Sequence, residues 1–316
     1  MKFWQHILSN LIDTHNVYLL TVIDNIGSSP GRKGFKMLVT EDGFIFGSIG
    51  GGLMEFSLVE EAKKLLQDGD LKIFLKKQLH QGHKENGSGM ICSGEQTVVF
   101  HPLGAQHISM IKGILDCLQA NNRGVFTLTP TSIIFSNEQL KGQFESKINS
   151  AQDWLYKEYI GFKNTLYIVG GGHVSLAVSD LFVTLGFHVV VVDNREYLST
   201  LDLNRSAHQK LVVDFNLITN YISEGSESYV VIMTSNYTDD EFVLSKLIRK
   251  SFAYIGILGS TSKLKTIWRA LQKKGVTASE LNVVHAPIGL AIKSQTPYEI
   301  AISIAAQIIM IKNRNQ

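Results

Sequence analysis

The strongest constraint on the fold is a series of short apolar runs that begins at Leu166. LYIV is followed by HVVVVD, KLVVD, YVVIMT and AYIGIL, and segments of helical length separate these runs. Strands that are apolar on both faces are typical of a parallel sheet, because helices cover both of its sides. The pattern therefore predicts a doubly wound α/β domain over residues 164–316.

A glycine-rich turn follows the first of these strands and leads into a helix. Its residues are Gly170, Gly171, Gly172 and His173. In this strand–turn–helix context, the first glycine allows a tight turn, and the glycine two positions later lets the backbone approach a phosphate. The N–H groups and the dipole at the helix start favour the negative charge, and His173 can donate to the same anion or cap the helix. The turn therefore predicts a site for a phosphate-bearing ligand.

An acidic residue extends this pattern, but only in part. Asp193 ends the second strand, 21 residues after Gly172, where dinucleotide-binding proteins use a carboxylate to bind a ribose hydroxyl. Ser175, however, replaces the third glycine of the G-x-G-x-x-G sequence. The turn fits NAD(P) and a pterin phosphate alike, and the alternative is that the glycines only pack the helix against the strand.

The first half of the chain has a different pattern. Strand-like runs, VYLLTVI, FKMLVT and GFIFGSI, are separated by turn residues, and a helix from Leu53 to Leu66 follows them. This pattern predicts a mixed α+β domain over residues 1–140. Residues 141–163 are polar and lack a sustained period, so we expect a linker there.

Two loops of the first half are candidate ligand-binding segments. The first carries Gly27, Ser28 and Ser29 and continues with two cations in GSSPGRKG. The second carries Gly50, Gly51 and Gly52, which offer backbone N–H groups to an anion at the start of the next helix. Glu55 lies in the first turn of that helix, where the helix dipole favours it. The alternative is that both segments are ordinary turns.

Composition argues against several classes of protein. The net charge is only +2, which argues against nucleic acid as a partner. The apolar stretch at residues 300–311 is shorter than the roughly 20 residues that cross a membrane. The N-terminus lacks the apolar core of a signal peptide, so we expect a cytoplasmic protein without membrane contact.

The two cysteines of the chain differ in their surroundings. Cys92 lies in MICSG, directly after a glycine- and serine-rich segment. A thiol in a loop is a candidate ligand for a soft metal, although a lone cysteine is commonly a small buried residue. Cys117 lies in an apolar helical stretch, where we expect it to belong to the core.

Together these motifs resemble the XdhC/CoxI family, whose members are accessory proteins that mature xanthine dehydrogenase and related molybdenum hydroxylases. The first half resembles the family's N-terminal domain in GSSPGRKGFKMLV, GSIGGGLME and MICSGEQTVVFHPLG. The second half resembles its Rossmann-type domain in IVGGGHVSLAVSDLFVTLGFHVVVVDNRE, YIGILGS and PIGLAIKSQTPYEIAISIAAQII. The resemblance extends over nearly the whole chain.

The resemblance implies a chaperone of the molybdenum cofactor (molybdopterin). Such a chaperone protects the cofactor while a cysteine desulfurase supplies sulfur, and delivers it to a xanthine dehydrogenase-type apo-enzyme. A homodimer is also implied. The cofactor-binding positions that the resemblance implies are Gly27, Ser28, Ser29, Gly50, Gly51, Gly52, Gly170, Gly172, His173 and Asp193, and it implies Cys92 as the metal contact.

Two other functions fit the sequence less well. The Gly170 turn and Asp193 alone suggest an NAD(P)-dependent oxidoreductase, but that function accounts for only half of the chain. Xanthine dehydrogenase itself does not fit, because two cysteines cannot ligate its iron–sulfur clusters, and we assign no catalytic residue. Leu53 stands where many relatives have a cysteine, so Cys92 is expected to act without a second thiol.

Overall fold

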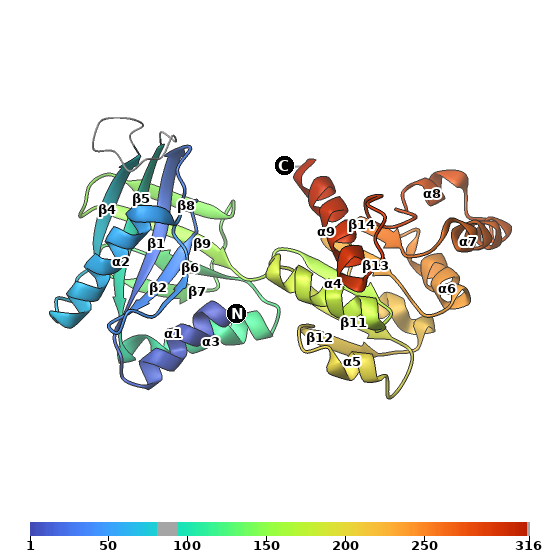
Figure 1. The fold of residues 1–316 in the computed structure, drawn as a ribbon, viewed down its shortest axis with the longest axis horizontal. Coiled ribbons are helices and arrows are strands. Elements are labelled where there is room, and N and C mark those ends of the chain that lie inside the picture. Colours follow the sequence, from blue (N-terminus) through green and yellow to red (C-terminus); the bar gives the residue numbers. More distant parts are fainter. Residues whose placement is uncertain (81–93, 315–316) are drawn as a thin grey trace. The chain divides into compact units, whose positions relative to one another are not determined.

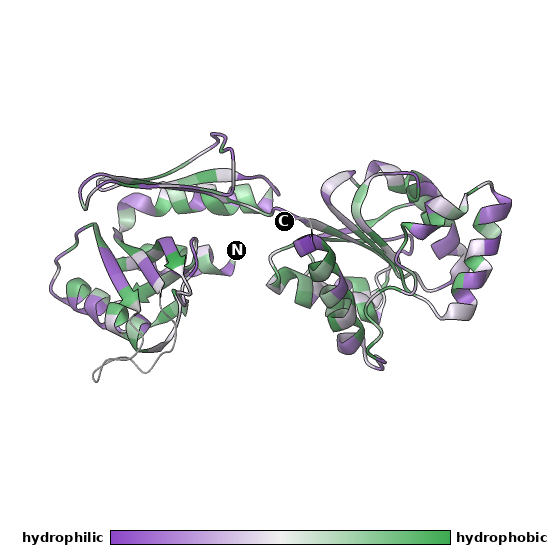
Figure 2. Cartoon of the chain, turned by 90° about the horizontal axis from the view of Figure 1, so that it is seen from above, coloured by the Kyte–Doolittle hydropathy of each residue, from purple (hydrophilic) through white to green (hydrophobic). Residues whose placement is uncertain are grey.

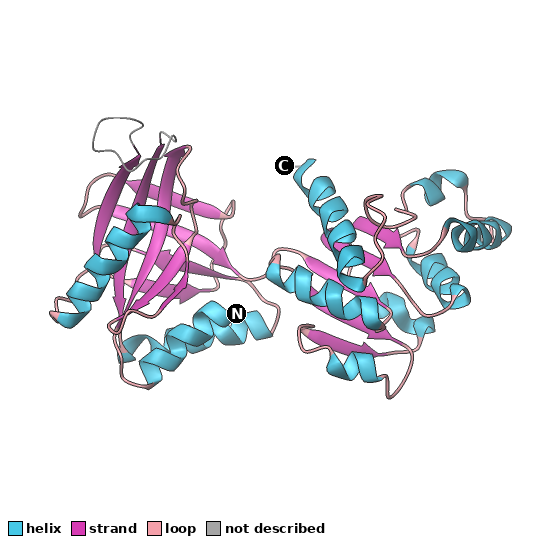
Figure 3. Ribbon diagram, in the orientation of Figure 1, coloured by secondary structure: helices cyan, strands magenta, loops and turns pink. Residues whose placement is uncertain are grey.

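The computed structural model describes residues 1–80 and 94–314 (Figure 1). The chain forms two compact units, Met1–Gly161 and Phe162–Gln316. Figure 3 shows that each unit has its own helices and strands. The predicted fold class, a mixed α+β region followed by a Rossmann-type domain, is confirmed.

The first unit contains a five-stranded antiparallel sheet. Across the sheet its strands are β3 (Ile45–Gly47), β2 (Lys36–Thr40), β1 (Val17–Gly27), β5 (Gly94–Leu103) and β4 (Phe74–His80). Helix α2 (Gly52–Gln67) covers one face, where Leu58 and Ala62 join a buried cluster with Leu20 and Phe100. Burial of these side chains holds α2 against the sheet and so positions the glycine loop at its start.

A four-stranded antiparallel sheet completes the first unit. Its order is β7 (Ile133–Ser136), β6 (Gly124–Leu128), β9 (Trp154–Ile160) and β8 (Phe144–Ile148). The helices of this part are α1 (Lys2–Ile12), the short 3-10 helix η1 (Ala105–His107) and α3 (Ile108–Gln119). Trp4 of α1 packs edge-on against Phe126 of β6, with ring centroids 5.3 Å apart, so α1 contacts this sheet.

The structure differs from the linker expected over residues 141–163. This segment forms β8 and β9, which pair with each other, and β9 also pairs with β6. Alternate residues of β9 are buried, among them Trp154, Tyr156 and Glu158. Apolar residues recur at every second position in part of this sequence, but the charged Lys157 and Glu158 make the segment resemble a polar linker.

The second unit is a five-stranded parallel sheet with helices on both faces. Across the sheet its strands are β12 (Gln209–Val212), β11 (His188–Asp193), β10 (Thr165–Val169), β13 (Gly225–Ile232) and β14 (Phe252–Ile257). The helices are α4 (His173–Thr184), α5 (Ser199–Leu203), η2 (Phe215–Asn220), α6 (Tyr237–Leu247), α7 (Thr261–Lys273), α8 (Ala278–Asn282) and α9 (Pro297–Arg314).

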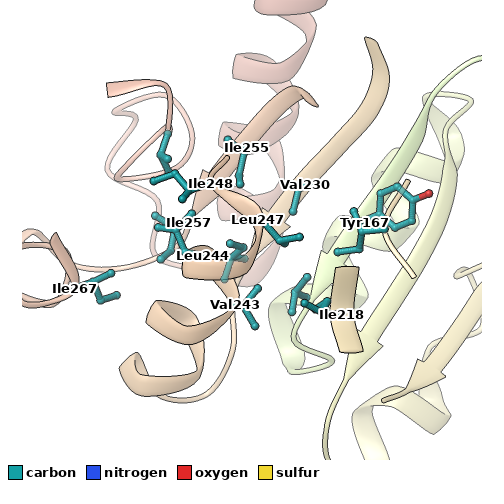
Figure 4. Packing of buried hydrophobic residues seen from close by; sticks show 14 of the residues in the cluster. Tyr167, Ile218, Val230, Val243, Leu244, Leu247, Ile248, Ile255, Ile257 and Ile267 are labelled. Carbon is teal, nitrogen blue, oxygen red and sulfur yellow. The ribbon is translucent and has the colours of Figure 1, made fainter. Parts of the chain in front are cut away.

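Alternate residues of the parallel strands supply one hydrophobic cluster on each face of the sheet. Tyr167 and Val169 of β10 belong to the cluster that includes α6 and α7, which Figure 4 shows. Leu166 and Ile168 belong to the cluster that includes α4 and α9. Figure 2 shows hydrophobic residues along these strands. Among the described residues, no helix has the length and apolar character needed to cross a membrane.

Candidate functional site

The carboxyl ends of the parallel strands meet at one edge of the second unit. β11 and β12 extend the sheet on one side of β10, and β13 and β14 extend it on the other, so the strand order reverses at β10. Ligands of open α/β sheets bind at such a switch point. The glycine turn after β10 and Asp193 at the end of β11 both lie at this edge.

Gly170 is required by the fold. Its φ of +116° is a conformation that favours glycine, and a Cβ atom there would come within 2.4 Å of the carbonyl oxygen of Met233. The backbone of β10 therefore passes directly beside the end of β13. This glycine is explained by packing alone.

Gly172 has no such packing role. It is the N-cap of α4 with φ −72° and ψ −173°, an extended conformation open to any residue, and a Cβ atom there would meet no atom of residues 1–80 and 94–314 within 4 Å. Within the described chain, the N–H groups of Gly172, His173 and Val174 have no hydrogen-bond acceptor. His173 is exposed at the same turn. The turn thus presents free donors and open space at a helix start, the geometry that binds phosphate.

Asp193 is already fully engaged by the protein. Its side chain accepts hydrogen bonds from the Gly171 N–H at 2.7 Å and from the Arg195 backbone N–H, Nε and Nη2 at 2.9, 2.9 and 2.8 Å. Burial alone would raise the pKa of this carboxyl group, but these donors outweigh burial and hold the pKa below its usual value. Asp193 is therefore a charged, buried part of the turn.

Other side chains, on which the sequence prediction did not rely, support the same edge. Thr200 donates from Oγ1 to the Gly171 carbonyl at 2.5 Å. After β13, the buried Asp240 accepts from the N–H and hydroxyl of Thr234 at 2.9 and 2.7 Å, and it pairs with Lys263. The available sequence signal is the group of polar residues directly after a strand, TSNYTDD.

In the first unit, the structure brings the two predicted glycine loops together. A Cβ atom on Gly50 would lie 2.6 Å from the backbone nitrogen of Gly31. Gln96 links the loops, because its Oε1 accepts from the Gly31 N–H at 3.0 Å and its Nε2 donates to the Ile49 carbonyl at 3.2 Å. Its Nε2 also donates to Gln78 at 2.8 Å. This buried glutamine pair was not predicted from the sequence, because its role depends on tertiary contacts.

Glu55 occupies the amide groups of the second loop. Its Oε2 accepts from the Ser48 hydroxyl at 2.7 Å and from the N–H groups of Ile49 and Gly51 at 2.8 and 3.0 Å. The predicted anion-binding loop therefore already holds a carboxylate of the protein itself. A Cβ atom on Gly51 would meet nothing within 4 Å, but its φ of +76° accounts for the glycine, and Gly52 likewise has a positive φ of 72°.

The remaining predicted residues of the first unit lie at the neighbouring loop. Gly27 ends β1 with φ +65°, Ser28 is exposed, and the buried Ser29 donates to the Gly31 carbonyl at 2.8 Å. Gly94, at the start of β5, packs against this loop, since a Cβ atom on it would lie 2.6 Å from the Ser29 backbone nitrogen.

Residues that could hold a metal are not gathered in the described part of the chain. Residues 1–80 and 94–314 contain no group of three or more His, Cys, Asp or Glu side chains suited to a metal ion. Cys92, the predicted metal contact, lies outside the described residues. Cys117 lies on α3 and is half-buried, and burial raises the pKa of its thiol.

Comparison with known proteins gives consistent matches over both units. The model of the XdhC and CoxI family matches residues 13–75, and the model of the XdhC Rossmann domain matches residues 166–308. A crystal structure described as a xanthine dehydrogenase from Bacillus halodurans aligns with a TM-score of 0.74 and 25% identity, covering 99% of this chain and 96% of that chain.

Two curated relatives extend these matches. The uncharacterized protein YqeB of Escherichia coli is 27% identical over 92% of this chain, which spans only 43% of that relative's length. A probable xanthine dehydrogenase subunit of Bacillus subtilis is 22% identical over 96% of each chain. The two family models together cover more than half of the chain, in the order that the motifs predict. The chain therefore belongs to the XdhC and CoxI family.

Proposed function

We propose that this protein acts in the maturation of xanthine dehydrogenase-type enzymes by binding the molybdenum cofactor through its phosphate. The relatives support the link to xanthine dehydrogenase, because one is named as a probable subunit of xanthine dehydrogenase and a structural match is described as a xanthine dehydrogenase. We further propose that the protein protects the cofactor while a cysteine desulfurase adds sulfur, and then delivers it to the apo-enzyme. The cysteine desulfurase, the apo-enzyme partner and a homodimer stay predictions.

The observation that carries the proposal is the turn at Gly172. The fold does not require a glycine there, and the N–H groups of Gly172, His173 and Val174 are without acceptors among the described residues. A phosphate group fits this turn, because it takes the open space beside the glycine and supplies acceptors to these donors. The residues present thus fit the phosphate end of the cofactor.

The metal end of the cofactor has no matching donor set in the described chain. Gly27, Ser28, Ser29 and Gly50–Gly52 of the first unit are retained as proposed cofactor-binding residues. Cys92 remains the proposed metal contact. Sulfur is a donor that soft metals prefer.

NAD(P) is the second candidate ligand for the turn. A dinucleotide places its ribose at the acid that ends the second strand, and here Asp193 is buried and engaged by four donors. A ligand that needs only a phosphate site is therefore favoured over NAD(P).

The proposal is tested by producing a molybdenum hydroxylase with and without this protein. We expect a larger active fraction of the hydroxylase in its presence and no oxidation of xanthine by this protein alone. An unchanged active fraction, or xanthine turnover by this chain free of other proteins, would refute the proposed function. Measuring total hydroxylase protein in both cultures separates maturation from expression.

A further inference from the structure

We infer that Arg195 makes the Gly172 turn selective for a ligand that ends in a phosphate group rather than in a nucleotide. The inference rests on the proposed function and specifies the class of ligand that the same site accepts. It concerns the carboxylate of Asp193, the last residue of β11, and the guanidinium group of Arg195 two residues later, at the edge where the turn lies.

The hydrogen bonds of Asp193 leave it no free acceptor position. Oδ1 accepts from the backbone N–H and Nε of Arg195, both at 2.9 Å. Oδ2 accepts from the Gly171 N–H at 2.7 Å and from Nη2 of Arg195 at 2.8 Å. A carboxylate has about four lone-pair sites, so these four donors fill it.

A nucleotide ribose must compete with this arrangement. In dinucleotide-binding proteins the hydroxyls of the ribose donate to the acid at this position. Here the side chain of Asp193 is only 2% exposed, and a planar guanidinium group holds both of its oxygens. A ribose can bind to Asp193 only if Arg195 moves away, which breaks the bidentate ion pair between Arg195 and Asp193. This cost disfavours NAD-like ligands.

A terminal phosphate avoids this competition. Its acceptors fit the N–H groups of Gly172, His173 and Val174, which have no acceptor within the described part of the chain, and need nothing from Asp193. The side chain of Arg195 is 39% exposed, so its positive charge is accessible to solvent beside the turn. The net effect of the pair is that the carboxylate stays neutralised and an approaching anion is not repelled.

The test is a gain of nucleotide binding on removal of the guanidinium group. Titration calorimetry with NAD⁺ and NADP⁺ is carried out on the full chain and on Arg195→Ala and Arg195→Met, whose folding is checked by thermal melting. We expect the Kd for NAD⁺ to fall about tenfold or more in both variants, because the freed Asp193 accepts charge-assisted hydrogen bonds from the ribose. Adding Asp193→Asn to either variant is expected to abolish the gain.

Arg205→Ala is the matched control, because Arg205 is an exposed arginine of the same unit without an ion pair among the described residues. It is expected to leave nucleotide binding unchanged. Nucleotide binding by the wild type as tight as by Arg195→Ala, tight NADP⁺ binding by the wild type, or a gain that survives Asp193→Asn would overturn the inference. Retention of a pterin phosphate by the wild type is measured separately, so failure of the proposed function is distinguishable from failure of the selectivity.

Discussion

Gly170 and Gly172 lie in one turn, but the structure gives them different reasons to be glycine. Gly170 combines a positive φ with a backbone contact to Met233, whereas Gly172 is extended and faces open space. A substitution at the first position therefore acts on folding, and a substitution at the second acts on whatever approaches the turn. A Gly170 variant is therefore a control for folding effects when a Gly172 variant is tested for ligand binding.

Replacing Gly170 by alanine is expected to destabilise the second unit. The new Cβ atom would lie 2.4 Å from a backbone carbonyl at a φ that side chains rarely adopt. We expect the free energy of unfolding to fall by about 2 kcal/mol or more, and Gly172→Ala to change it by less than about 0.5 kcal/mol. Urea unfolding measures both, and equal stabilities of the two variants would contradict this assignment.

Replacing Gly172 by aspartate is expected to weaken ligand binding in a folded protein. The carboxylate would stand where the turn approaches phosphate, and like charges there cost roughly 1–3 kcal/mol, or about 5- to 150-fold in Kd. Titration with a pterin phosphate measures the loss. Gly113→Asp is the control, because a Cβ atom on Gly113 of α3 also meets nothing within 4 Å. An unchanged Kd for the pterin phosphate in folded Gly172→Asp would show that Gly172 does not contribute to ligand binding.

At this scale the sequence indicates where donors and acids stand but not which of them are free. The positions of Asp193 and Glu55 follow from strand and helix boundaries, and both were predictable. Two contacts depend on side-chain conformations in the folded protein. Arg195 donates to the carboxylate of Asp193, and Glu55 accepts from the N–H groups of Ile49 and Gly51. From the sequence pattern alone, the Asp193 carboxylate and these loop N–H groups are expected to be free for a ligand, so too many ligand-binding groups are predicted.

At the scale of elements, one buried ion pair joins the two sheets of the first unit. Lys36 of β2 pairs with Glu158 of β9, and Tyr156 donates to the same carboxylate at 2.9 Å. Burial, and then the charge of Glu158, raise the pKa of Tyr156, so its hydroxyl stays protonated as a donor. The side chains of Lys36 and Glu158 are only 11% and 4% exposed.

Glu158→Ala is expected to lower the free energy of unfolding of the first unit by about 3–5 kcal/mol, because it leaves the Lys36 ammonium buried without its partner. Glu145→Ala on the adjacent β8 is the control, since its ion pair with Lys147 is exposed and is expected to contribute less than about 1 kcal/mol. Urea unfolding compares the two variants. A loss at Glu158 no larger than at Glu145 would show that the pair does not hold the sheets together.

The elements themselves were predictable to different degrees. The five parallel strands and the helices between them follow from short, continuous apolar runs separated by segments of helical length, because both faces of that sheet are buried. β8 and β9 were missed because β9 buries a glutamate, whose ion-pair partner Lys36 lies on a strand more than 100 residues earlier. A local pattern carries no information on such a partner.

At the scale of the whole molecule, each unit contains a buried neutral histidine. Desolvation, and then nearby His208, lower the pKa of His188 to about 4, and desolvation is also the main cause that lowers the pKa of His101 to about 4. Both side chains are almost completely buried. The unfolded chain has a histidine pKa near 6.5 and takes up protons first, so acid favours unfolding of both units.

We expect the contribution of these two histidines to stability to be constant above about pH 7, and stability to fall as the pH decreases from about 6.5 toward 4, by on the order of 2 kcal/mol per histidine at pH 5. Urea unfolding at several pH values, with His188→Phe, measures this effect. That variant is expected to remove part of the acid sensitivity, whereas His15→Phe at an exposed position is expected to remove none. Equal acid sensitivity of wild type and His188→Phe would contradict the assignment.

Binding of a pterin cofactor's phosphate by the turn at Gly172 can be measured by identifying the ligand that the protein retains. The protein is co-expressed with the cofactor pathway, purified, and examined by native mass spectrometry. We expect a retained pterin with a terminal phosphate and no nicotinamide nucleotide. A retained nicotinamide dinucleotide, or a protein free of any ligand under these conditions, would contradict it.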